Sequence, residues 1–159
     1  MNQETYLSVD QLLSALDHAW RDPVVVAGLF TSVHCPFCLA LKREQLTPRM
    51  RSSVTPRLVV VEFDVDRMTP FALPNHQQGA QQTTPAKSLP PGPSTTVTQW
   101  GKAHGMSLTP TLFMLNEKAE PLSGPQHAPL IGYASRDFYA VYLEERIQAA
   151  HAYWKSKRK

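Results

Sequence analysis

Cysteine is scarce in this chain: Cys35 and Cys38 are the only two in 159 residues. The length and the hydrophobic share of 42% suit a single domain, residues 1–159, with a core of its own. Such a domain needs no disulfide to hold itself together. A bridge between cysteines three positions apart would close a very short loop and stabilise little, so a structural staple is the weakest interpretation of the pair.

Long apolar runs are also missing, and no stretch approaches the length of a membrane span. The first ten residues, MNQETYLSVD, are polar and lack the charged-then-apolar order of a signal peptide. Either the protein is cytoplasmic, or a leader has been removed and Met1 comes from expression. Two cysteines alone do not decide the compartment.

Basic and metal-binding patterns are sparse. The net charge of +3 comes partly from the tail WKSKRK, residues 154–159, and no basic stripe with interleaved aromatics accompanies it, so nucleic acid is not an expected partner. The six histidines are scattered, and none has a strong ligand spacing. A structural zinc site normally needs four ligands. Two thiolates still suit a soft ion such as Cu(I), so a metal-binding or metallochaperone module stays as an alternative.

The apolar pattern predicts the order helix, strand, Cys-x-x-Cys helix, strand, insertion, helix, strand, strand, helix. Residues 67–95 are the expected insertion, a flexible loop with six prolines and four glutamines and no helical or strand period. The other predicted segments are a helix from Ser8 to Trp20 opened by a capping box with Gln11, a strand at 24–30, a helix from Cys35 with an end or kink at Thr47–Pro48, a strand at 57–66, a helix at 96–104 followed by Gly105, strands at 109–116 and 128–133, and a final helix capped by Ser135.

The cysteine pair follows a buried strand and opens a helix, which is the pattern expected of a redox dithiol. The free amides and the dipole at a helix N-terminus stabilise a thiolate, so Cys35 is the predicted nucleophile. Cys38 lies one turn further on and is the predicted resolving thiol. Pro36 fits the first turn, where no N–H is needed. Phe37 offers an apolar surface to a substrate polypeptide.

Three further residues bear on this chemistry. His34 either stabilises a Cys35 thiolate when protonated or is a plain exposed side chain. A cis bond before Pro110 would turn the backbone of Thr109 toward the cysteines and free its amide for a substrate strand, although cis is a minority state for such bonds.

Glu62 interrupts the apolar run LVVVEFDVD, residues 58–66. It either faces solvent near a sheet edge or lies beneath Cys38 with a raised pKa and takes the proton of that thiol.

At these positions the chain resembles the thioredoxin superfamily. The resemblance rests on VVVAGLF running into Cys35-Pro36-Phe37-Cys38, on Thr109-Pro110-Thr111 opening a later strand, and on the ending LFMLNEKAEPL…LIGYASRDFYAVYLEE. It implies an α/β thioredoxin fold, a central mixed sheet of about four to five strands flanked by helices, with the Pro/Gln-rich segment inserted. It also implies that Pro110 is cis and that Cys35 is the exposed nucleophile.

Within the superfamily the chain looks most like bacterial periplasmic thioredoxin-like reductases of cytochrome c maturation and sulfur oxidation, and the Cys-Pro-aromatic-Cys motif also resembles glutaredoxins. It departs from the family at two places: Leu29 stands where thioredoxin has a buried aspartate, and Glu62 stands where the family has a buried lysine. Any proton acceptor under Cys38 would therefore be Glu62.

The expected function is a thiol–disulfide oxidoreductase, a reductase of protein disulfides that needs no cofactor beyond its cysteines. The reducing direction is expected because Phe37 places no cation beside the Cys35 thiolate; such a cation would stabilise the reduced dithiol form and make the pair an oxidant. Expected partners are protein disulfide or dithiol substrates and an upstream thiol electron donor, with the protein itself a periplasmic monomer. A glutathione-dependent enzyme is the remaining alternative.

Overall fold

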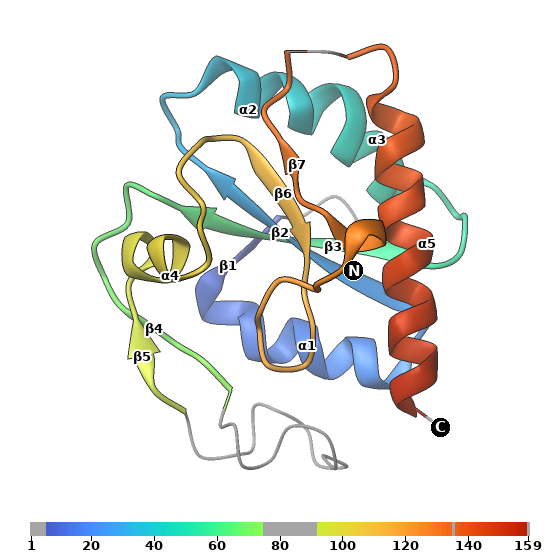
Figure 1. The fold of residues 1–159 in the computed structure, drawn as a ribbon, viewed down its shortest axis with the longest axis horizontal. Coiled ribbons are helices and arrows are strands. Elements are labelled where there is room, and N and C mark those ends of the chain that lie inside the picture. Colours follow the sequence, from blue (N-terminus) through green and yellow to red (C-terminus); the bar gives the residue numbers. More distant parts are fainter. Residues whose placement is uncertain (1–5, 75–91, 135, 159) are drawn as a thin grey trace.

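A five-stranded mixed sheet forms the centre of the molecule (Figure 1). The computed structural model describes residues 6–74, 92–134 and 136–158. The strand order is β1-β3-β2-β6-β7; β1 and β2 run parallel to β3, while β6 is antiparallel to β2 and β7 to β6. The mixed α/β architecture predicted from the sequence is confirmed. The strands are β1 (Leu7–Ser8), β2 (Val24–Thr31), β3 (Arg57–Asp64), β6 (Thr111–Met114) and β7 (Leu130–Ile131).

Helices cover both faces of this sheet. One face packs against α1 (Leu12–Arg21) and α4 (Val97–Ala103), and the other against α2 (Pro36–Leu41), α3 (Thr47–Arg51) and α5 (Tyr139–Arg158). The C-terminal end of α5 reaches α1, where the rings of Trp20 and Trp154 meet edge to face with centroids 5.4 Å apart. Each face therefore has its own apolar core.

The central strand β2 is buried along its whole length, as its continuous apolar sequence predicts. Successive side chains alternate between the two cores: Val26 and Phe30 face α1 and α4, whereas Ala27 and Leu29 face α2 and α5. The same alternation places Thr31, the last residue of β2, on the α2 side. This strand leads directly to the cysteines.

Several boundaries differ from the prediction. Leu7 and Ser8 form an edge strand, a short 3₁₀ turn (Val9–Gln11) follows, and α1 begins only at Leu12. The Ser8 amide donates to Gln11 Oε1 at 3.0 Å, the backbone-capping half of the expected capping box. Gly105 has φ +72°, which confirms the expected left-handed residue after α4.

The cysteine helix neither ends nor breaks at Pro48. It passes through a π-helical turn (Lys42–Leu46) and continues as α3 to Arg51. In a π turn the backbone hydrogen bonds join residues five apart instead of four. This accommodates Pro48, which has no N–H to donate and whose ring would clash with the carbonyl four residues earlier in a regular α-helix. The turn also brings Glu44 and Gln45 to the hydroxyl of Tyr133 in the segment after β7.

The expected insertion has ordered ends. Phe71–Ala72 (β4) pairs antiparallel with Ser94–Thr95 (β5), where no strand was predicted. Phe71 is buried and meets Phe63 edge to face, which attaches this small sheet to the core. Residues 75–91, and the predicted cap Ser135, lie outside the described residues. The last helix begins at Tyr139 and is preceded by a turn.

Candidate active site

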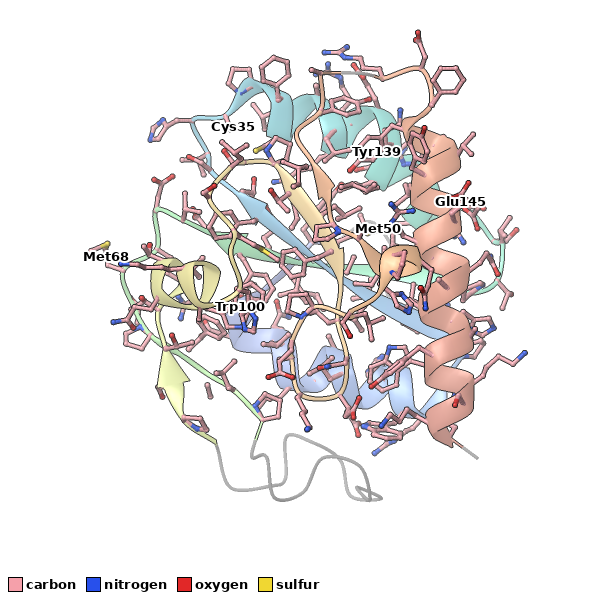
Figure 2. All side chains as sticks on the ribbon, viewed as in Figure 1. Cys35, Met50, Met68, Trp100, Tyr139 and Glu145 are labelled. Carbon is pink, nitrogen blue, oxygen red and sulfur yellow. The ribbon has the colours of Figure 1, made fainter. Side chains whose placement is uncertain are left out.

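The two cysteines lie at the junction between β2 and α2, at one end of the central sheet. Cys35 is the N-cap residue of α2, with extended backbone, and Pro36 occupies the first turn. Figure 2 shows Cys35 beside the start of α2, above the segment that leads into β6. Both thiols are free; Cys35 is partly exposed and Cys38 is buried. An exposed thiol in front of a buried one is the arrangement predicted for nucleophile and resolving residue.

Hydrogen bonds converge on the Cys35 sulfur. The Cys38 amide donates to Cys35 Sγ at 3.3 Å, and the Cys35 thiol donates to the Thr109 carbonyl at 3.7 Å. Burial raises the pKa of Cys35, but bonds from the side chains of Cys38 and Thr109 and from the amides of Cys38 and Phe37 outweigh it, and the pKa is lowered. Cys35 is therefore the more easily ionised thiol.

Cys38 has the opposite environment. It is 1% exposed, and desolvation raises its pKa, with the neighbouring Cys35 acting in the same direction. Two groups at the end of β2, the Thr31 side chain and the Ser32 amide, act against this rise. The two thiols of the pair are thus held with different proton affinities.

The proline segment lies where the sequence predicted it. The Thr109–Pro110 peptide bond is cis, as the resemblance implied, and the Thr109 carbonyl contacts Cys35. Pro110 is buried, and its carbonyl accepts from the Gly132 amide at 2.7 Å, next to β7. The structure therefore brings Cys35, Cys38, Thr109 and Pro110 together from two distant parts of the chain.

Exposed apolar side chains occur in both segments that meet at Cys35. Phe37 is 51% exposed, and the exposed large apolar residues nearby in the same two segments are Val33, Leu39 and Leu108. Pro36 is also exposed. His34 is exposed on the loop, and its backbone amide donates to Ser32 Oγ. Within the described residues its imidazole forms no hydrogen bond or ion pair with Cys35, which favours the plain surface interpretation.

Glu62 has a partner that the sequence did not suggest. Its carboxylate forms an ion pair with Lys42, one helical turn beyond Cys38, and the two side chains are 28% and 22% exposed. A raised pKa beneath Cys38 was expected on the assumption that Glu62 is buried and has no cationic partner, and this assumption is wrong. Nor does it lie at a sheet edge, because β3 is flanked by β1 and β2, and Glu62 pairs with Leu29 in the register.

The Lys42–Glu62 pair opens into a surface pocket of about 350 Å³. Val33 of the cysteine loop and Tyr6 also line it. The ammonium group of Lys42 lies 5.1 Å from the centroid of the Tyr6 ring. Solvent in this pocket reaches the carboxylate on the same side of the sheet as α2.

Thr31 is a site residue that the sequence analysis missed. Its side chain is 3% exposed, and its hydroxyl has no hydrogen-bond partner among the residues that the structure describes. One feature of the sequence could have indicated Thr31: it is a polar residue that ends an otherwise apolar strand, four residues before Cys35.

Metal and membrane features are absent from the described parts of the chain. No three His, Cys, Asp or Glu side chains gather there in a way that could hold a metal ion. No helix in residues 6–74, 92–134 or 136–158 is long and apolar enough to cross a membrane.

Comparison with known proteins agrees with this geometry. Residues 7–146 match the family model of the thioredoxin-like domain. A solved thioredoxin-fold protein from Helicobacter pylori is 12% identical over 93% of this chain and 98% of its own, with a TM-score of 0.46. A likeness that low carries no argument about activity. No curated protein sequence matches this chain significantly.

Proposed function

Since the chain belongs to the thioredoxin-like domain family, we propose that it is a thiol–disulfide oxidoreductase that reduces protein disulfides. The observation that carries this proposal is the asymmetry of the Cys35–Cys38 pair. Cys35 is partly exposed with a lowered pKa at the start of α2, and Cys38 is buried behind it with a raised pKa. A structural pair of thiols needs no such difference.

The reaction takes place in two exchanges. The Cys35 thiolate attacks one sulfur of a substrate disulfide; a Cys35–substrate bond forms, the substrate disulfide breaks, and the other substrate sulfur leaves as a thiolate. Cys38 then loses its proton and attacks Cys35 Sγ. The Cys35–Cys38 bond forms, the mixed disulfide breaks, and the second substrate sulfur leaves. The substrate gains two electrons, and the enzyme pair gives them up.

Protein substrates fit the surface around Cys35. Pro36 and Phe37 present an exposed apolar face with no charge beside the thiolate. Thr109 and Pro110 hold a backbone segment against Cys35 from the other side. A polypeptide in extended form can dock between these two segments, with its backbone on Thr109 and an apolar side chain on Phe37.

Glu62 is the proposed proton acceptor for Cys38. It lies on the α2 side of β3, and its partner Lys42 is one turn from Cys38 on the same helix. The open pocket beside the pair gives the carboxylate a path for exchanging protons with solvent. The step requires only that the Glu62 carboxylate receives the proton of Cys38, directly or through water.

The partners and the setting follow from the same chemistry. An upstream thiol donor must reduce the Cys35–Cys38 disulfide after each turnover, and no cofactor is required. We propose a monomer acting in the periplasm, on the resemblance to periplasmic reductases; the cytoplasm is the alternative. The reducing direction rests on the absence of a cation beside Cys35 within the motif itself.

The test is reduction of a disulfide-bonded protein such as insulin, with dithiothreitol as electron donor. Wild-type protein should accelerate the reaction, and Cys35→Ser should not. Cys38→Ser should accumulate a mixed disulfide with the substrate through Cys35. Brief alkylation at neutral pH, followed by mass mapping, should label Cys35 far faster than Cys38. Preferential labelling of Cys38, or activity in Cys35→Ser, would overturn the proposal.

A further inference from the structure

The Thr31 hydroxyl is a buried polar group without an evident structural use. It is 3% exposed and has no hydrogen-bond partner among the described residues. An unpaired buried hydroxyl normally lowers stability, and native structures contain few of them. Thr111, the other buried threonine near the cysteines, behaves differently, since its hydroxyl donates to the Leu108 carbonyl at 2.7 Å.

The surroundings of Thr31 point to an acceptor that forms during the reaction. Strand alternation places the side chain on the side of β2 where Ala27 and Leu29 pack against α2. Cys38 is a buried residue of that helix, and the Thr31 side chain acts to lower its pKa. The Ser32 amide acts on the same sulfur. Phe30, just before Thr31, pairs with Thr111, the residue after Pro110, so Thr31 stands at the end of the sheet where α2 and its cysteines begin.

We propose that Thr31 is a positioning residue whose hydroxyl donates a hydrogen bond to the Cys38 thiolate as that thiolate forms. The buried thiol offers a weak acceptor, whereas the thiolate is a charged one, and hydrogen bonds to charged groups are stronger. The bond holds the resolving sulfur in place and lowers the free energy of its ionised form. This inference rests on the proposed function, because it concerns the second of the two exchanges.

In this role the Thr31 hydroxyl contributes to the reaction and is dispensable for the fold. Thr31→Val keeps the shape of the side chain and removes a hydroxyl that has no partner among the described residues. The variant should therefore be as stable as the wild type or more stable. Thr31→Ser keeps the hydroxyl and should restore wild-type kinetics. Thr111→Val is the matched control, because it removes a hydroxyl that already has an acceptor.

The experiment follows reduced protein mixed with an excess of Ellman's reagent, a small aromatic disulfide. Attack by Cys35 releases one coloured thiolate at a rate that depends on reagent concentration. Resolution by Cys38 releases the second at a rate that does not. In the intermediate Cys35 carries no charge, so the pH profile of the second phase reports on Cys38. The other titratable groups near the end of β2 are unchanged in every variant: His34, Glu62 with its partner Lys42, Asp64 and Asp66.

The expected signature is a crossing of two pH profiles. Loss of one hydrogen bond to a charged sulfur raises the pKa of Cys38 by about one unit. Below that pKa the thiolate fraction falls about tenfold while its nucleophilicity rises about threefold, so resolution in Thr31→Val is about threefold slower. Above the pKa of the variant, where Cys38 is ionised in both wild type and Thr31→Val, resolution in the variant is up to about threefold faster. A merely structural defect slows resolution at every pH.

Each outcome decides the matter. Crossing profiles in Thr31→Val, wild-type behaviour in Thr31→Ser and no crossing in Thr111→Val support the role of Thr31. Superimposed profiles for Thr31→Val and wild type, or slowing at all pH values, overturn it. If wild-type protein shows no second phase at all, the proposed oxidoreductase function fails, and that result is distinct from a failure of Thr31 alone.

Discussion

Replacing Glu62 by glutamine tests the proposed proton acceptor at small cost to the fold. The substitution keeps the size of the side chain and removes the negative charge of the Lys42–Glu62 pair. Both side chains are about a quarter exposed, at 22% and 28%. Solvent therefore screens the pair, and its loss should lower the free energy of unfolding by about 1 kcal/mol. The domain remains folded, and its kinetics can be measured.

The chemical effect should appear in one phase only. If the Glu62 carboxylate takes the Cys38 proton, Glu62→Gln slows the second release from Ellman's reagent by about a hundredfold, the low end of general-base effects. The low end is expected because the open pocket lets water replace the lost base in part. The first phase, which reports attack by Cys35, should be nearly unchanged.

Lys42→Met is the matched control. It breaks the same ion pair at a similar loss of stability but leaves the carboxylate in place. If the Glu62 carboxylate is the base, it is still present in this variant, so the second phase should not be slowed. An unchanged second phase in Glu62→Gln would return Glu62 to a surface ion pair. Equal slowing in both variants would show that the ion pair positions α2 and that Glu62 is no base.

Two further predictions concern stability. Gly28→Ala should lower the free energy of unfolding, measured in urea, by about 1–3 kcal/mol, because its Cβ would lie 2.1 Å from Phe113 Cε2. Gly105→Ala has open space around it but a φ of +72°, so it should lose only about 1 kcal/mol. A loss in Gly28→Ala that is equal to or smaller than the loss in Gly105→Ala would refute the packing argument. Glu117 is 5% exposed, and although burial raises its pKa, the Tyr153 hydroxyl and Lys157 lower it overall. Its stabilising contribution is therefore present above the unfolded-state pKa of about 4.3 and is lost as the pH falls through the lower folded-state pKa. Without the hydroxyl the folded-state pKa of Glu117 lies closer to the unfolded-state value, so Tyr153→Phe should be less stable than wild type at neutral pH and its deficit should shrink as the pH falls, in urea unfolding from about pH 7 to 3. Parallel curves would contradict this role of the hydroxyl.

The order of the main elements could be predicted because each has a strong local signal. The apolar run of β2, the cysteine motif and Gly105 specify a strand, a helix start and a helix end through nearest neighbours alone. Short elements could not be found in this way. Leu7–Ser8 is a strand only because β3 lies beside it, and Phe71–Ala72 only because Ser94–Thr95 returns to pair with it.

The residues of the site likewise differ in whether a local sequence signal indicates them. The proximity and the unequal exposure of Cys35 and Cys38 could be predicted because both residues belong to one helix start. The partner of Glu62 could not be predicted, because Lys42 is twenty residues away and meets it only when α2 packs on β3. Thr31 was overlooked because a threonine in a strand is ordinary; its buried, unpaired hydroxyl is visible only in the described three-dimensional surroundings.

A redox titration of the wild-type protein, with alkylation and mass mapping at each point, tests the central claim most directly. The account predicts one intramolecular Cys35–Cys38 disulfide that follows a two-electron curve, with a tenfold change in the oxidised-to-reduced ratio for about every 30 mV. For a reductase the midpoint should lie nearer the value of about −270 mV known for thioredoxin than the value of about −120 mV known for strong oxidants. Thiols that form no such disulfide across this range would contradict the account.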